Sequence, residues 1–188
     1  MPDPIADVAT YDFLSPDQQR AMDQDGCFVV ENALPADVVG ELDAAIDEVY
    51  EREQRAGRLP EDGRLNMRNC VTEHDAFLQL IDWPTTFPKA MGILNWNIHL
   101  ITSHLLVLPS KEAPEQPVRV GLHRDGGTSA REMVEPHPRI LFKIGYVISD
   151  QTDSASGATV VVPGSNRYLG APPTDPETGG ARGAISMN

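Results

Sequence analysis

The chain has 188 residues, of which 28 are acidic and 15 basic, so its formal net charge at pH 7 is −13. This length allows one domain with its own hydrophobic core, and 40% apolar residues are typical of a globular protein rather than a disordered one. The negative charge without Lys/Arg clusters excludes a typical nucleic-acid partner, and no apolar run approaches the ~18 residues of a membrane span.

A short helix is predicted from residue 15 onward. Ser15 is a suitable N-cap, Pro16 fits the first helical position, and Gln18 can complete a capping box. Gly26 is expected to end this helix, and a short strand is expected over residues 27–30.

A second, longer helix is predicted to open at residues 34–37 and to end at Gly57, followed by a polar loop over residues 58–64. Apolar residues recur in this helix at helical spacing, so one of its faces should be buried. These residues are Val38, Val39, Leu42, Ala45, Ile46 and Val49. Two more short helices are expected, over residues 74–81 and after Pro84.

After Asn95 the pattern changes from helices to strands. Residues of one parity between positions 96 and 108 form a long β-type run: Trp96, Ile98, Leu100, Thr102, His104, Leu106 and Leu108. Four further strands joined by loops are predicted, over residues 118–122, 139–148, 159–162 and 184–188. Helices followed by many strands favour one α+β domain over residues 1–188, helical over about 15–94 and β-rich over about 95–188.

His123 and Asp125 are the residues that best fit a catalytic centre. Residues i and i+2 of an extended segment point to the same side, so the imidazole and the carboxylate should converge. Gly126 and Gly127 would leave space beyond them. Such a pair supplies two ligands of the 2-His-1-carboxylate arrangement that holds Fe(II), although a solvated surface pair has the same sequence.

The motifs around this pair resemble the phytanoyl-CoA dioxygenase family of Fe(II)/2-oxoglutarate oxygenases. His-X-Asp is followed by a hydrophobic strand that ends at Asp150, and then by a Gly157-Ala158 step and a Val-Val-Pro-Gly-Ser-Asn turn that ends at Asn166. With the opening segment at residues 25–35, the resemblance covers about residues 14–166. It implies a double-stranded β-helix (jelly-roll) core with N-terminal helices on one side.

The resemblance also implies roles for individual residues. His123 and Asp125 match the first two iron ligands, and Tyr146 stands where the family has an aromatic residue beside 2-oxoglutarate. His104 and Arg68 stand where further contacts with this cosubstrate lie, although His104 and Tyr146 also fit a role in the core. With Fe(II), 2-oxoglutarate and O2, such an enzyme would hydroxylate a small organic molecule. We expect this substrate to be a secondary metabolite. Asp125 favours hydroxylation because related halogenases have a small residue in place of the carboxylate.

The chain also departs from the family pattern. Asn166 replaces a histidine that is not a ligand, and Leu108 stands where some relatives have a lysine that faces the cosubstrate. A second histidine ligand and the arginine that follows it in the family are missing. The only histidine after Asp125 is His137, which lies in a loop between two prolines. We therefore expect the 188 residues to be a portion of a longer enzyme.

Two other readings of the sequence remain open. One is a catalytically inactive jelly-roll binding module without a complete iron triad, and the other is a cupin-like metal enzyme of a different kind. Cys27 and Cys70 are too few for a disulfide framework or a zinc site, and no secretory signal opens the chain. We expect a cytoplasmic protein with reduced thiols, and the sequence leaves its oligomeric state open.

Overall fold

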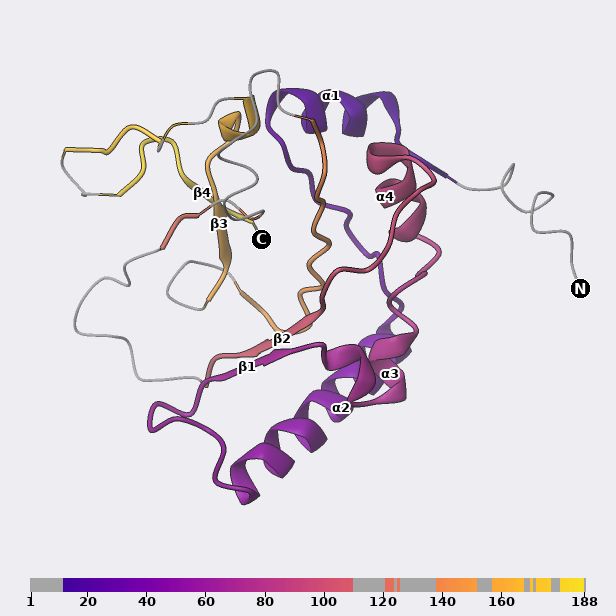
Figure 1. Ribbon diagram of the computed structural model, residues 1–188, viewed down its shortest axis with the longest axis vertical. Helices are drawn as coiled ribbons and strands as arrows, with labels where there is room; N and C mark the ends of the chain where they lie inside the picture. The colour runs from indigo at the N-terminus through magenta and orange to yellow at the C-terminus, as the bar shows by residue number, and fades with distance from the viewer. Residues whose placement is uncertain are drawn as a thin grey trace, which may run out of the picture.

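The computed structural model describes residues 12–109, 121–123, 125, 138–151, 157–167, 170, 172–176 and 180–187. Its elements follow in chain order: α1 (Pro16–Gln24), α2 (Ala36–Arg55), β1 (Leu65–Arg68), η2 (Cys70–Thr72), α3 (Asp75–Leu78), α4 (Phe87–Leu94), β2 (His104–Val107), β3 (Thr159–Val161), η4 (Ser165–Arg167) and β4 (Ile185–Met187). Figure 1 shows α2 and α3 beside the β1–β2 pair, with β3 and β4 in a different part of the molecule. No helix in the described ranges is long and apolar enough to cross a membrane.

The predicted start of α1 is confirmed. The backbone N–H of Gln18 donates to Ser15 Oγ at 3.1 Å, and the Ser15 N–H donates to Gln18 Oε1 at 3.0 Å, which completes the capping box. After the end of α1, Gly26 takes a left-handed conformation with φ +78°, as a residue that terminates a helix often does.

The predicted amphipathic helix is confirmed as α2, and its buried face organises the main core. Leu42, Ala45 and Val49 are buried, as the helical spacing requires. They pack with side chains from both strands of the β1–β2 pair, from η2 and from α3. The complete cluster is Leu42, Ala45, Val49, Leu65, Cys70, Ala76, Phe77 and Leu105.

The strands β1 and β2 pair antiparallel, and their register separates two faces. Leu65 lies opposite Val107, and Met67 lies opposite Leu105, all four on the face that packs against the core. The expected run over residues 96–108 is therefore too long, because only His104–Val107 form a strand. The core side of this strand belongs to Leu105 and Val107, whereas His104 and Leu106 are exposed. The physical reason is that burial against α2 selects the face, and alternation then exposes the other one.

The other predicted elements are confirmed in part. The β3–β4 pair falls within the expected strands 159–162 and 184–188, α4 follows Pro84, and α3 covers only four residues of 74–81. Residues 27–30 and 139–148 contain no strand, which corrects the prediction. The exposure in 142–148 does alternate, but a strand also needs a hydrogen-bonded ladder, which alternation cannot supply. The described residues form two two-stranded sheets without jelly-roll closure, and residues 118–120 lie outside them.

A network of charges ties the end of α2 to the loop that follows. Glu53 is only 7% exposed, and its carboxylate accepts two hydrogen bonds from the Arg58 guanidinium, at 2.6 and 2.7 Å. Arg52 bonds to Glu53 at 3.2 Å and also pairs with Glu73 beside η2. Arg58 first, and Arg52 with it, lower the pKa of Glu53 from its ordinary value of 4.5 to about 2.

The Glu53 network predicts a pH dependence of stability. Because the pKa is lower in the folded state, the ionised carboxylate stabilises the fold above about pH 4.5, and this contribution disappears as the pH falls toward 2. We expect Glu53→Gln to lower the melting temperature at pH 7 and the difference from wild type to shrink over that acid range. Glu51→Gln, which removes a surface pair with Arg55 at 3.9 Å, is the control and should match wild type. A difference that is constant from pH 7 to pH 2 would contradict the assignment.

A second prediction concerns the contact between Gly26 and η4. The backbone N–H of Gly164 donates to Asp25 O at 3.0 Å, and a Cβ on Gly26 would lie 2.7 Å from Asn166 Cβ. We expect Gly26→Ala to lower the free energy of unfolding by more than about 1 kcal/mol in urea titrations. An alanine would be strained at this positive φ, and its methyl group would overlap with Asn166. Gly40→Ala, inside α2 and with open space around its Cβ, should instead stabilise by roughly 0.5–1 kcal/mol. Equal effects at both positions would contradict this account.

Candidate metal centre

The structure brings the side chains of His123 and Asp125 together. His123 Nε2 lies 3.4 Å from Asp125 Oδ1, and Asp125 itself lies in a bend. Both residues are exposed, so an ion from solvent could reach the space between them. His123 Nδ1 lies 3.3 Å from the carbonyl oxygen of Gly121. In the tautomer whose Nδ1–H donates to this carbonyl, Nε2 keeps its lone pair for a ligand.

This geometry fits two ligands of one divalent ion. Two donor atoms that each bind an ion at about 2.1 Å lie roughly 3.0 Å apart at a right angle and about 3.4 Å apart at a tetrahedral angle. The distance between His123 Nε2 and Asp125 Oδ1 falls at the upper end of this range. An imidazole together with a carboxylate is also the donor set that non-haem Fe(II) accepts. The pair could therefore hold such an ion with little movement.

A third ligand is not found among the residues that the structure describes. Within those ranges, no group of three His, Cys, Asp or Glu side chains could hold a metal ion. His137, which we considered from the sequence, lies outside the described residues, as do Gly126 and Gly127. The described part of the centre thus consists of His123 and Asp125.

Lys143 is a residue of the site that the sequence reasoning missed. Its Nζ lies 2.5 Å from Asp125 Oδ2, on the other oxygen of the carboxylate from the one beside His123. The hydrogen bond from Lys143 is the main reason that the pKa of Asp125 is below its ordinary value of 3.8, against the opposing effect of burial. The ionised Asp125 carboxylate is therefore already paired with one cation, the Lys143 ammonium group. The sequence carries one signal for this position. The even-numbered residues of 142–148 are all apolar or aromatic, so Lys143 is expected on the opposite face of the segment.

Arg68 and His104 lie directly opposite each other on β1 and β2. Cross-strand partners project from the same face of a sheet, and here both are exposed, on the face away from α2. Neither side chain makes an ion pair with another residue in the described ranges. The structure thus brings together two of the residues that we expected to contact the cosubstrate.

Tyr146 is half-buried, whereas Leu108 is exposed. The Tyr146 hydroxyl bonds to Thr86 Oγ1 and donates to Leu80 O at 3.2 Å, and burial raises the pKa of this phenol. Its hydroxyl therefore points to the residues that precede α4, and its contact with 2-oxoglutarate stays a prediction. Leu108 lies against Gly157, where a Cβ would be 2.9 Å from Leu108 Cδ1, so an apolar side chain fills the place at which some relatives have a lysine.

Comparison with known proteins gives one family match. The family described as Phytanoyl-CoA dioxygenase (PhyH) matches residues 22–181, a range that includes β1, β2 and the His123–Asp125 pair. Neither the curated proteins nor the solved structures contain a significant match.

The environment of Tyr146 predicts a structural contribution of its hydroxyl. Tyr146→Phe should lower the free energy of unfolding by about 0.5–1.5 kcal/mol, because it leaves Thr86, which is buried, without this partner. In a double-mutant cycle with Thr86→Val, measured by urea unfolding, the two effects should be coupled by roughly 0.5 kcal/mol or more. Strictly additive effects would show that the hydroxyl pair does not contribute to stability.

Proposed function

Because the chain belongs to the phytanoyl-CoA dioxygenase family, we propose that it is an Fe(II)- and 2-oxoglutarate-dependent oxygenase that hydroxylates a small organic molecule. The family match supports an oxygenase in general. The observation that carries the more specific proposal is the convergence of His123 and Asp125, whose donor atoms lie 3.4 Å apart with a chemistry suited to Fe(II).

In this proposal, His123 Nε2 and Asp125 Oδ1 hold the iron. Bound Fe(II) with 2-oxoglutarate would supply the oxidation of a substrate C–H bond by O2. The carboxylate of Asp125 contributes negative charge to the ion, and its pKa, below the ordinary value of 3.8, leaves it ionised well into the acid range. The Gly121 carbonyl orients the ring of His123, which fixes the direction of its metal-binding lone pair.

We propose that Arg68 and His104 help to bind the carboxylate groups of 2-oxoglutarate. The whole chain carries a net charge of −13, so the attraction for a dicarboxylate must come from local cations. Arg68 is exposed, has no described acidic partner, and lies opposite His104 on the face away from the core. A guanidinium in this position can bind a carboxylate through two hydrogen bonds.

The natural substrate is proposed only as a class. We propose a small secondary metabolite as the substrate. The negative charge of the chain disfavours nucleic acid as a substrate or partner. Cys27 and Cys70 are both free thiols, which supports a reducing compartment such as the cytoplasm.

Turnover of 2-oxoglutarate tests the proposed function. The full-length protein, purified and supplied with Fe(II) and O2, should release succinate from 2-oxoglutarate, and His123→Ala or Asp125→Ala should reduce this release by roughly 100-fold or more, because each removes a ligand. His99→Ala is the control, since this exposed histidine belongs to no part of the proposed site and should leave the rate unchanged. Succinate release by Asp125→Ala at the wild-type rate would exclude the ligand assignment. Binding of 2-oxoglutarate without any Fe(II)-dependent turnover would instead favour the non-catalytic binding module.

A further inference from the structure

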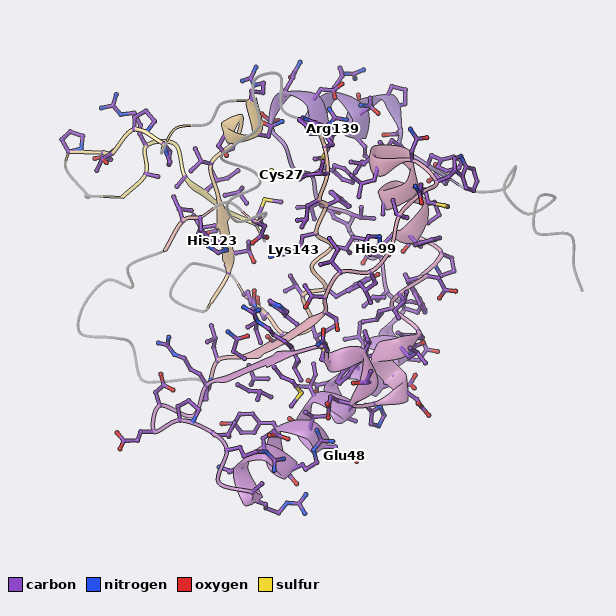
Figure 2. The ribbon with its side chains drawn as sticks, in the orientation of Figure 1. Cys27, Glu48, His99, His123, Arg139 and Lys143 are labelled. Atoms are coloured by element: carbon purple, nitrogen blue, oxygen red, sulfur yellow. The ribbon has the colours of Figure 1, made fainter. Side chains whose placement is uncertain are left out.

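Lys143 occupies a position that the proposed function does not explain. Among the described residues, it is the one lysine or arginine that pairs with Asp125, and its side chain is 62% exposed. Its ammonium group contacts Oδ2, whereas His123 approaches Oδ1 of the same carboxylate. Figure 2 shows His123 and Lys143 on different stretches of the chain, with the Lys143 side chain extending toward the side of His123.

The alternation of the segment directs Lys143 to the open side. Lys143, Gly145 and Val147 are exposed, whereas Tyr146 is half-buried with its hydroxyl on Thr86. A Cβ on Gly145 would have no heavy atom within 4 Å, so space is free beside Lys143. The ammonium group therefore has room to leave Asp125 and to meet a molecule from solvent.

A divalent ion on Asp125 would change the electrostatics of this lysine. The ion and the ammonium group have charges of the same sign, so they compete for one carboxylate and repel each other. Once the ion is bound, Lys143 has lost most of its partner's negative charge. A carboxylate of the incoming cosubstrate is then the natural replacement, because a charge-assisted hydrogen bond satisfies the ammonium group.

We infer that Lys143 exchanges partners during assembly of the site: it pairs with Asp125 while the metal is absent and binds a carboxylate of 2-oxoglutarate once the metal is present. This inference rests on the proposed function. It assigns a cosubstrate contact to Lys143 on the open face of residues 142–148, in place of the contact expected at Tyr146, which lies on the opposite face. Binding of the metal and binding of the cosubstrate therefore strengthen each other. The metal separates Lys143 from Asp125, and the carboxylate of the cosubstrate then pairs with the ammonium group that the metal has displaced.

The experiment measures binding, with the full chain and Mn(II) as the probe. Lys143→Met keeps the length of the side chain and removes its charge. We expect this variant to bind Mn(II) alone roughly 2- to 5-fold more tightly than wild type, because the competing cation is gone. With Mn(II) bound, the same variant should bind 2-oxoglutarate about ten-fold more weakly or worse, because the carboxylate has lost its partner. Free Mn(II) is followed by electron paramagnetic resonance, and 2-oxoglutarate binding is followed by calorimetry.

Two further variants serve as controls. Lys143→Arg keeps the charge and should stay close to wild type in both measurements. Arg139→Gln removes a positive charge from the same segment, but Arg139 pairs with Asp23 of α1, so neither affinity should change.

Two results would overturn the inference alone. Weaker Mn(II) binding by Lys143→Met would mean that the lysine only holds Asp125 in place, and unchanged 2-oxoglutarate binding would remove the second partner. The proposed function fails in a different way: Mn(II) binding that is undetectable in wild type, or that is unaffected by His123→Ala, contradicts the metal centre. In that case the inference falls as well, because no ion is present to displace Lys143.

Discussion

The candidate site depends on the fact that an extended segment presents its side chains on two opposite faces. Side chains in an extended segment alternate, so burial of one face against helices dictates what the other face presents. In β1 and β2, Leu65 and Leu105 pack against α2, and Arg68 and His104 consequently share the opposite, exposed face. The same alternation in residues 142–148 separates Tyr146 from Lys143. A shift of one residue in either segment would exchange the core residues with those proposed to bind ligands.

Two sets of cationic residues differ in how they are paired. Arg52 and Arg58 are fully engaged with Glu53 and Glu73, and they join the end of α2 to the neighbouring loop and to η2. Among the described residues, Arg68 has no acidic partner, and Lys143 pairs only with Asp125, the neighbour of His123. In a chain with a net charge of −13, such unsatisfied or exchangeable cations are the places at which an anionic molecule can be held.

Membership of the phytanoyl-CoA dioxygenase family and the local geometry support the same chemistry from different directions. The family match covers residues 22–181 and indicates an oxygenase, whereas the geometry identifies which donor atoms converge. The contribution of the structure is the second layer around these donors. The carbonyl oxygen of Gly121 lies 3.3 Å from Nδ1 of His123, and Lys143 pairs with the second oxygen of the Asp125 carboxylate. A metal site depends on such neighbours as much as on the ligands themselves.

The sequence by itself determined the features that depend on a few neighbouring residues. The capping box of Ser15 and Gln18, the buried face of α2 and the convergence of His123 with Asp125 are all local, because their geometry follows from the periods of helix and extended chain. Only the tertiary structure decided which parity of residues 104–108 faces the core, that Leu65–Arg68 form a strand, and that Lys143 reaches Asp125 while Tyr146 reaches Thr86. These contacts join residues far apart in the chain. Packing against the helices decides which face of each segment is buried, and no local sequence pattern contains this information.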